Sequence, residues 1–334
     1  MFGWKDQRIK VHCVTSCLCE VVKRYSEIDY RPFYFGIWDE PFGVLEQELR
    51  YYDPAFTHER LMNNFEQLFG GTVTRWHKAE RSAEDNAKRL IELVEHGREG
   101  QHVIVQVDLS LIPERENEFK LSPFPHYVLI SAGEKREEWY MLDADLKWEG
   151  ALSRERVLDA FIRNPYPDGL LVDATSLRVP SIEQVTAAFA RTHHPESNPL
   201  VTRLRGLLAH YAVAPERLPR LVDALQHLHV IVIRKYSYDY ALMYFHDQMK
   251  LDPDHYEQWA QRIRDLVQAF TTFQYRTVKL ALTGRIELLP SLEEQLDRVE
   301  ALEKSLKLEL KRLLDGWLAE QHQQKEASVH EALQ

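Results

Sequence analysis

The stretch HCVTSCLCEVVKRY, residues 12–25, decides the N-terminal fold. Its apolar residues recur at spacings of three and four, which predicts a helix with one buried face that begins at or near Cys13. A thiol in the first turn of a helix lies at the positive end of the helix dipole, which lowers its pKa. Because the thiolate is the nucleophilic form of cysteine, Cys13 is the candidate nucleophile.

The neighbouring cysteines, Cys17 and Cys19, fall on the same predicted helix. Three cysteines within seven residues are too few and too crowded for a disulfide framework, so we expect reduced thiols. A zinc site would need a second cluster of Cys or His at ligand spacing besides His12, and the sequence lacks one. We therefore predict buried structural thiols at these two positions, a packing role for His12, and neither a metal nor another cofactor.

A partner for the thiol follows more than a hundred residues later, in a predicted hairpin. One strand starts at His126, a turn lies at residues 133–136, and the second strand runs into Asp143. If the hairpin is centred on residues 134–135, positions 126 and 143 lie directly opposite each other and their side chains can meet. Asp145 is the competing carboxylate, and the same register argument ranks it second.

These pieces carry a resemblance that covers about the first 165 residues. The region resembles the papain-like domain of butirosin-biosynthesis-type acyltransferases and, more distantly, bacteriocin-processing papain-like cysteine peptidases. The matching features are His12-Cys13 before an apolar helix, the helix 82–95 followed by Gly97, the strand ending in Val107-Asp108-Leu109, His126-Tyr127-Val128-Leu129-Ile130, Gly133 and Leu142-Asp143.

The resemblance implies an α+β, papain-like catalytic domain. It assigns Cys13 as nucleophile, His126 as general base and Asp143 as the residue that orients His126. Papain-like enzymes also place a glutamine six residues before the nucleophile as an oxyanion donor, and Gln7 stands at that position.

From Pro180 onward, glycine and β-branched runs become scarce and helical patterns follow one another. A chain of 334 residues exceeds what one core usually organises, so we expect two domains and a tail. We predict a papain-like domain at 1–178, an all-α substrate or partner domain at 179–324 and a flexible tail at 325–334. The leucine stripe in the last helical pattern, 291–323, either packs within its own domain or forms a homodimer seam.

Two groups of residues are candidates for substrate binding. Arg234, Tyr238 and Asp239 interrupt an apolar helical pattern; they either form internal pairs or hold an amine or carboxylate in a cleft between domains. Trp38 belongs to an aromatic stretch that either packs in the core or lines a substrate pocket.

The resemblance implies a cysteine acyltransferase in specialised-metabolite biosynthesis. It would take an acyl group from a thioester on an acyl carrier protein, hold it on Cys13, and pass it to an amine acceptor. One alternative is a papain-like amidase, thioesterase or peptidase, in which water replaces the amine. A second is a binding protein that retains the fold without turnover.

The net charge of −10 argues against nucleic-acid binding, which needs a basic face. Carrier proteins are typically acidic, so delivery by such a partner requires a local basic patch. The candidates are Lys5, Arg8 and Lys10, or Arg203, Arg205, Arg217 and Arg220. No apolar run approaches the roughly 20 residues that cross a bilayer, and no secretion signal opens the chain, so we predict a cytoplasmic protein without a membrane partner.

Overall fold

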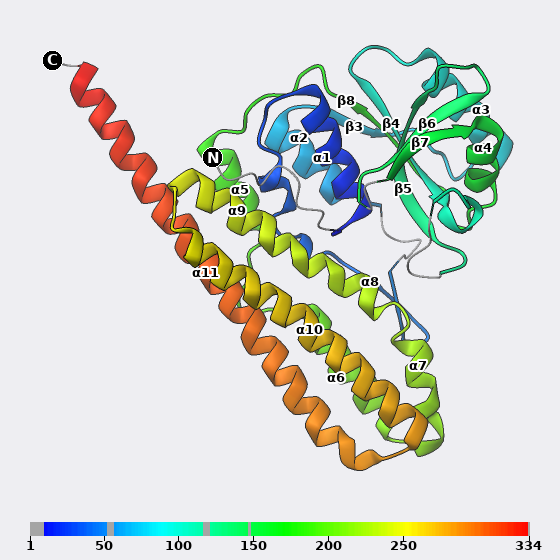
Figure 1. Cartoon of the computed structure of the whole chain (residues 1–334), viewed down its shortest axis with the longest axis vertical. Helices are drawn as coiled ribbons and strands as arrows, with labels where there is room; N and C mark the ends of the chain where they lie inside the picture. The colour runs from blue at the N-terminus through cyan, green and yellow to red at the C-terminus, as the bar shows by residue number, and fades with distance from the viewer. Residues whose placement is uncertain (1–9, 52–56, 116–120, 146–147, 333–334) are drawn as a thin grey trace. The chain divides into compact units, whose positions relative to one another are not determined.

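The computed structural model describes residues 10–51, 57–115, 121–145 and 148–332, and its chain divides into two compact units (Figure 1). Unit 1 consists of Met1–Phe33 and Thr57–Val185. Unit 2 consists of Tyr34–Phe56 and Thr186–Gln334. Each unit is described by itself below.

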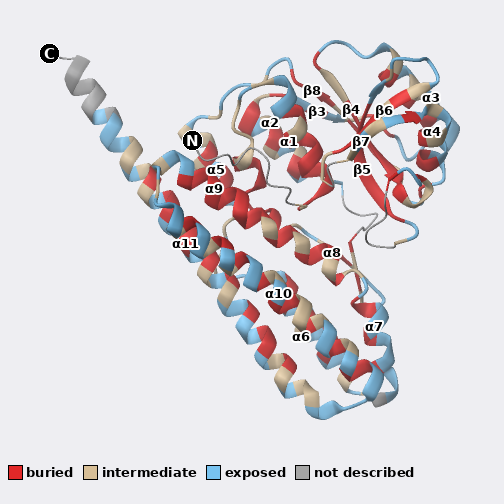
Figure 2. Ribbon diagram, in the orientation of Figure 1, coloured by how far each residue is buried: buried red, intermediate tan, exposed pale blue. Residues whose placement is uncertain are grey.

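Within the described residues, unit 1 is built on a six-stranded antiparallel sheet with the strand order β3-β8-β4-β5-β6-β7. Residues 103–108 of β4 are all buried, as a Val- and Ile-rich strand covered on both faces should be (Figure 2). The expected α+β class with an antiparallel sheet is confirmed. The strands are β3 Thr72–Arg75, β4 Gln101–Asp108, β5 Pro125–Ala132, β6 Glu138–Asp143, β7 Trp148–Ser153 and β8 Gly169–Asp173.

Helix α3 of unit 1 begins at a capping residue. The side chain of Ser82 accepts a hydrogen bond from the N–H of Asp85 at 3.1 Å and caps this helix, which lies where the sequence predicts one. Helices α3 and α4 share one apolar core with β4, β5 and β6, whereas α1 packs against β5. The helices are α1 Cys13–Tyr25, α2 Glu59–Phe69, α3 Ala83–His96 and α4 Arg154–Ile162, with a 3₁₀ turn η4 at Leu109–Leu111.

The register of the β5–β6 hairpin differs from the predicted one by two residues. Leu129 pairs with Leu142, so extending the ladder places Asp143 opposite Val128 and not opposite His126. Residues two apart on a strand share a face, so Asp143 is a diagonal neighbour of His126 on that face. The direct cross-strand pairing predicted from the sequence was wrong, because the turn closes between Gly133 and Glu138, further along the chain than assumed.

Unit 2 is helical, with a short hairpin of β1 Gly43–Leu45 and β2 Glu48–Arg50. Its two long helices, α10 and α11, pack side by side (Figure 1). Helix α11 extends to Ala332 and so includes residues 325–332, which the sequence predicts as a tail. Its helical elements are α5 Ile182–Thr192, α6 Pro199–Ala212, η5 Pro215–Arg220, α7 Leu221–Ala224, α8 Leu228–Val232, η6 Ile233–Tyr236, α9 Ser237–Met249, α10 Pro253–Thr283, η7 Ile286–Leu288 and α11 Leu289–Ala332.

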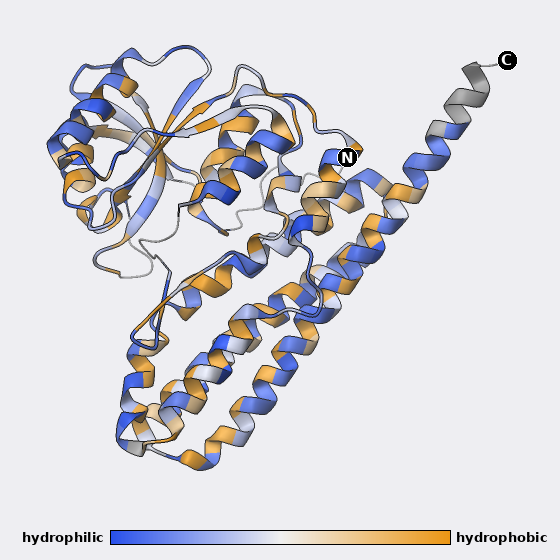
Figure 3. Ribbon diagram, turned by 180° about the vertical axis from the view of Figure 1, so that it is seen from behind, coloured by the Kyte–Doolittle hydropathy of each residue, from blue (hydrophilic) through white to orange (hydrophobic). Residues whose placement is uncertain are grey.

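The leucine stripe of α11 is covered within the single chain. Hydrophobic and hydrophilic positions alternate along this helix (Figure 3), and the hydrophobic ones at Leu292, Leu296 and Leu310 are fully buried. The stripe therefore packs within the chain, and its burial gives no support to the predicted dimer seam.

Unit 2 also contains the aromatic segment that follows α1. This segment starts at Tyr34, the last residue of the 3₁₀ turn η2 Arg31–Tyr34, and includes the turn η3 Ile37–Asp39. Tyr34 stacks on Tyr240 with ring centroids 3.8 Å apart, and Trp38 stacks on Tyr238 at 4.4 Å. Core packing of these aromatics, one of the two predicted alternatives, is therefore observed, in the core of the helical unit.

Among the described residues, no helix has the length and apolar character needed to cross a membrane.

Candidate active site

Cys13 is the first residue of α1. His12 caps the helix: its Nδ1 accepts from the N–H of Thr15 at 3.4 Å, and its carbonyl accepts from the N–H of Ser16 at 2.8 Å. The Cys13 side chain is buried and is not in a disulfide. The thiol therefore lies at the positive end of the helix dipole, where the sequence placed it.

Asp145 holds the start of α1 in place. Its Oδ1 accepts from the backbone N–H groups of Val11 and His12 at 2.9 and 3.1 Å. The same oxygen accepts from the hydroxyl of Ser16 at 2.8 Å. Burial raises the pKa of Asp145, and the nearby imidazole of His126 opposes that rise. Asp145, which the sequence offered as the alternative to Asp143, therefore has a structural role: it holds the start of α1 in place.

His126 and Asp143 form a buried hydrogen-bonded pair. The His126 Nε2 donates to Asp143 Oδ1 at 2.9 Å, and the exposed fractions of the two residues are 4% and 0%. Burial alone lowers the pKa of His126, but the carboxylate of Asp143 more than offsets this, so the pKa of the imidazole is raised. With Nε2 committed to Asp143, Nδ1 is the nitrogen that a thiol can meet.

The start of α1 and His126 belong to one region of unit 1. The Cys17 thiol, one turn after Cys13, donates to the carbonyl of Tyr127 at 3.4 Å. Asp145 bonds the start of α1 and also raises the pKa of His126 through its charge. Asp143, which bonds His126, is two residues before Asp145, which bonds the start of α1, so the helix start, the imidazole and the two carboxylates form one polar cluster.

Arg115 is a member of this cluster that sequence reasoning missed. Its Nε donates to Asp143 Oδ2 at 3.0 Å, and its side chain is as buried as its partner. The Arg115 Nη2 is buried and has no hydrogen-bond partner among the described residues. Arg115 lies in a polar connection between β4 and β5, and no spacing or motif in that connection marks it.

Gln7, the predicted oxyanion donor, lies outside the described residues, as do Lys5 and Arg8 of the predicted basic patch. Their roles stay predictions.

The side chains predicted to bind substrate have partners within unit 2. Arg234 Nη1 donates to the carbonyls of Glu40 and Pro41 at 2.9 and 2.8 Å. Tyr238, stacked on Trp38, donates to Glu303 at 3.0 Å, and Asp239 accepts from Tyr256 at 2.7 Å. These contacts are the internal pairing that the sequence offered as an alternative, and the substrate-binding role stays a prediction.

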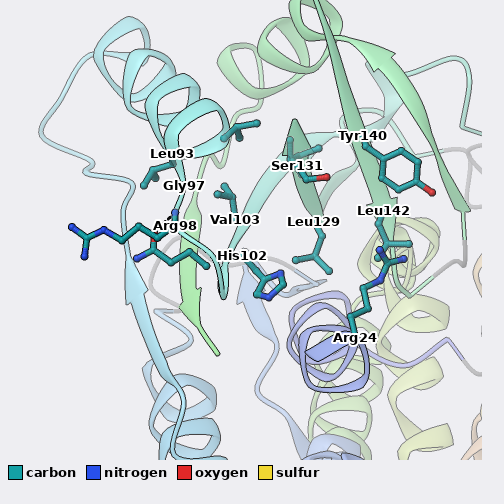
Figure 4. A pocket seen from close by; sticks show the side chains of 13 residues that line it. Arg24, Leu93, Gly97, Arg98, His102, Val103, Leu129, Ser131, Tyr140 and Leu142 are labelled. Carbon is teal, nitrogen blue, oxygen red and sulfur yellow. Dashed lines mark hydrogen bonds between the residues drawn. The ribbon is translucent and has the colours of Figure 1, made fainter. Parts of the chain in front are cut away.

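Unit 1 also has a cavity of about 170 Å³ beside the sheet (Figure 4). An apolar floor that includes Leu129 and Leu142 is bordered by Arg24 and His102. Leu129 and Ser131 lie three and five positions after His126 on β5, so their side chains point to the face of the sheet opposite to His126. The cavity is therefore separate from the cluster around His126.

The chain thus combines an α+β unit, which has a buried His–Asp pair and a cysteine as the first residue of a helix, with a helical unit. Two family descriptions match it: the DUF6005 N-terminal domain over residues 8–177 and the DUF6005 C-terminal domain over residues 183–331. The chain belongs to the DUF6005 family. These matches do not confirm the resemblance to butirosin-type acyltransferases.

A curated relative is the petrobactin synthase of Bacillus anthracis. It is 40% identical over 312 residues, which cover 92% of this chain and 95% of the relative. The family thus includes a biosynthetic enzyme.

Proposed function

We propose that unit 1 is a papain-like cysteine acyltransferase with Cys13 as nucleophile, His126 as general base and Asp143 as the orienting carboxylate. The observation that carries the proposal is the buried His126–Asp143 hydrogen bond in the same polar cluster as the helix start that bears Cys13. A cysteine at a helix N-terminus, with an imidazole steadied by a carboxylate, is the arrangement that generates a reactive thiolate.

The reaction follows from these groups. The Cys13 thiolate attacks the carbonyl of an acyl thioester, and amides at the start of α1 stabilise the oxyanion. The tetrahedral intermediate expels the donor thiol, which takes its proton from the His126 imidazolium. An amine then attacks the acyl-Cys13 carbonyl and gives a proton to His126, which releases the amide and restores the thiolate.

The name of the relative supports transfer over hydrolysis. A synthase forms bonds in its product instead of hydrolysing them, which favours an acceptor other than water for the acyl group. We therefore propose a thioester donor, with a carrier protein as its usual bearer, and an amine acceptor in the biosynthesis of a specialised metabolite.

An acidic carrier protein would need basic side chains on this chain whose charge is not already neutralised. Arg205 already pairs with Glu293, Asp297 and Glu300, so its charge is neutralised within the unit. Arg203, Arg217 and Arg220 are exposed and are the better candidates for a carrier-binding surface.

Intact-mass spectrometry after incubation with the acetyl and benzoyl thioesters of N-acetylcysteamine tests the nucleophile. We expect an adduct of one acyl group that is lost in Cys13→Ala and retained in Cys17→Ala and Cys19→Ala. The last two are matched controls, because all three thiols are buried on α1. Adduct formation that survives Cys13→Ala would contradict the proposal.

Adding n-butylamine to the acylated enzyme separates transfer from hydrolysis. Transfer predicts the butylamide and loss of the adduct at a rate that rises with amine concentration. A rate that ignores the amine, with the free acid as product, would identify a hydrolase instead.

A further inference from the structure

Asp145 holds the helix start that bears Cys13 through a single carboxylate oxygen. Its Oδ1 accepts from the backbone N–H groups of Val11 and His12 and from the hydroxyl of Ser16. Each of these bonds needs only an acceptor oxygen, which the side-chain amide of an asparagine would also supply. Anchoring the helix therefore does not by itself account for a negative charge at this position.

The charge of Asp145 acts on the imidazole of His126. Asp145 lies two residues after Asp143, whose carboxylate accepts from His126 Nε2 at 2.9 Å. The charge of Asp145 raises the pKa of His126, and the charge of His126 opposes the rise that burial causes in the pKa of Asp145. The imidazolium and the carboxylate therefore stabilise each other in their charged forms.

The formal charges of Arg115, Asp143, Asp145 and His126 balance only when Asp145 is counted. Arg115 donates to Asp143 at 3.0 Å, so these two opposite charges offset each other. Asp145 is then the carboxylate that compensates the imidazolium of His126. A charge without compensation is costly among side chains this buried, so loss of the Asp145 charge should favour the neutral imidazole.

We infer that Asp145 is a positioning residue for the proposed acyl transfer and acts through His126: its negative charge keeps the imidazole protonated until the donor thiol departs. The inference rests on the proposed function, in which the departing thiol takes its proton from the His126 imidazolium. After that transfer, the same charge favours the return of a proton. Asp145 therefore also strengthens His126 as the base that receives a proton from the amine.

The other titratable and charged groups near His126 do not replace this charge. They are His12, Cys13 and Cys17 of α1, Asp108 of β4, Asp143 of β6 and Arg115 of the β4–β5 connection. Burial, followed by the charge of Cys13, raises the pKa of Cys17 well above the usual value, so this thiol stays neutral. His12 Nδ1 accepts from the N–H of Thr15.

Asp108 is turned away from His126. It follows Val107, the residue of β4 that pairs with His126, so its side chain points to the opposite face of the sheet. Its Oδ1 accepts from the N–H and hydroxyl of Ser110 and from the N–H of Phe124. Asp145 is therefore the carboxylate to change.

Asp145→Asn removes the charge and keeps an acceptor oxygen for the start of α1. Asp145→Ser is a second neutral variant, and Asp145→Glu keeps the charge. Asp85→Asn is the matched control for a lost negative charge, because Asp85 is exposed on α3 of the same unit. Thermal denaturation establishes which variants fold.

The test is the pH dependence of Cys13 acylation by the benzoyl thioester of N-acetylcysteamine, followed by intact mass between pH 5 and 9. The rate should rise with pH as the thiolate forms, and fall again as the imidazolium that protonates the donor thiol loses its proton. Loss of a nearby anion favours the thiolate and disfavours the imidazolium. Both limbs should therefore move to lower pH in the neutral variants, by about one pH unit.

Two comparisons separate this charge effect from a structural one. Asp145→Glu and Asp85→Asn should keep both limbs where they are in wild type, whereas a damaged helix anchor would lower the maximum rate without moving the limbs. Alkylation of Cys13 by iodoacetamide needs only the thiolate, so it reports the rising limb without a thioester.

The outcomes distinguish the two proposals. If wild type is alkylated at Cys13 but forms no acyl adduct, the acyltransferase proposal fails and this inference fails with it. If wild type is acylated and a folded neutral variant keeps both limbs unmoved, only the role of Asp145 is overturned. If neither neutral variant folds, the charge serves the fold, and the role of Asp145 is overturned as well.

Discussion

Asp143 accepts hydrogen bonds on both of its carboxylate oxygens, from His126 and from Arg115. No more than 5% of any of these three residues is exposed. A carboxylate buried this deeply stays ionised only if neighbouring donors compensate for the water it has lost. Arg115 supplies a full positive charge for that purpose, so the ionised form of Asp143 depends on Arg115 as well as on His126.

Arg115→Met should therefore slow acylation of Cys13, although the substitution does not change Cys13 itself. Loss of the guanidinium favours the protonated form of Asp143, which no longer holds the His126 imidazolium. We expect acylation of Cys13 to slow by about 10- to 100-fold at pH 7, as for loss of a supporting group in acid–base catalysis. The rate of adduct formation by intact mass measures this.

Arg115→Lys is the matched control, because it keeps the charge but loses the planar geometry. It should recover part of the rate. Thermal denaturation of both variants distinguishes a damaged site from a damaged fold. An Arg115→Met protein that acylates as fast as wild type while remaining folded would remove Arg115 from the site.

The carboxylate that bonds His126 is the one favoured from the sequence, although the supporting register was incorrect. The order Cys, His, Asp and the alternation of strand residues are visible in the sequence, and they put Asp143 on the face of His126. The exact turn closure is not visible, because several turns fit the residues 133–137. Arg115 was missed for a different reason: it reaches Asp143 from a connection without periodic pattern.

At the scale of elements, helices α9 and α10 meet at a buried carboxylate. Asp239 of α9 accepts from the Tyr256 hydroxyl of α10 at 2.7 Å. Burial raises the pKa of Asp239 to about 6, and the hydrogen bond from Tyr256 only partly opposes this rise. The folded protein therefore holds this proton more tightly than the unfolded chain does.

The raised pKa of Asp239 makes the stability of unit 2 depend on pH. Between the unfolded pKa of Asp, about 4, and the folded value of about 6, the folded state binds more protons, so its stability falls as the pH rises through this window. Asp239→Asn should remove that slope and stabilise unit 2 at pH 8 by on the order of 1–3 kcal/mol. Urea unfolding followed by circular dichroism at pH 4, 6 and 8 measures the effect.

Asp265→Asn on α10 is the control, since Asp265 is exposed. It should leave the pH profile unchanged. If Asp239→Asn retains the wild-type slope between pH 4 and 6, another group causes it.

Most elements were predictable from local signals. Cys13 and Ser82 mark helix starts through the helical pattern or cap that follows them, and the β-branched run after Gly100 marks β4. The sequence does not show to which unit the aromatic segment after α1 belongs. Its apolar side chains would be buried against either unit, so burial preference alone does not choose.

In the molecule as a whole, the aromatic segment after α1 makes unit 2 discontinuous in sequence. Tyr34–Phe56 precedes most of unit 1 in the chain but packs with the helices that follow residue 185. Lys235, which is buried, donates to the Trp38 carbonyl at 2.7 Å and to Asp39 at 3.2 Å. The helical unit thus depends on residues from the N-terminal part of the chain.

A fragment of residues 179–334 should consequently be incomplete. Without Tyr34, Phe35 and Trp38, the aromatic side chains of α9 that they cover become exposed. Each aromatic buries about 150–250 Å², so the new apolar patch is on the order of 500 Å², enough to promote association. We expect the fragment to bind a hydrophobic dye and to elute as aggregates in size-exclusion chromatography.

Fusing residues 34–56 to the fragment through a Gly/Ser linker should lower dye binding and restore a monomer. Equal behaviour of the two fragments, both monomeric and cooperatively unfolding, would show that the segment is dispensable.

The polypeptide passes from one unit to the other after residues 33, 56 and 185. A stop codon after residue 185 would therefore remove the helices of unit 2 but leave its apolar segment, residues 34–56, attached to unit 1. To express unit 1 alone, a gene must lack residues 34–56 as well as residues 186–334. A recombination event that exchanges the helices of unit 2 must also exchange the upstream coding sequence of residues 34–56 if the new unit is to have a complete core.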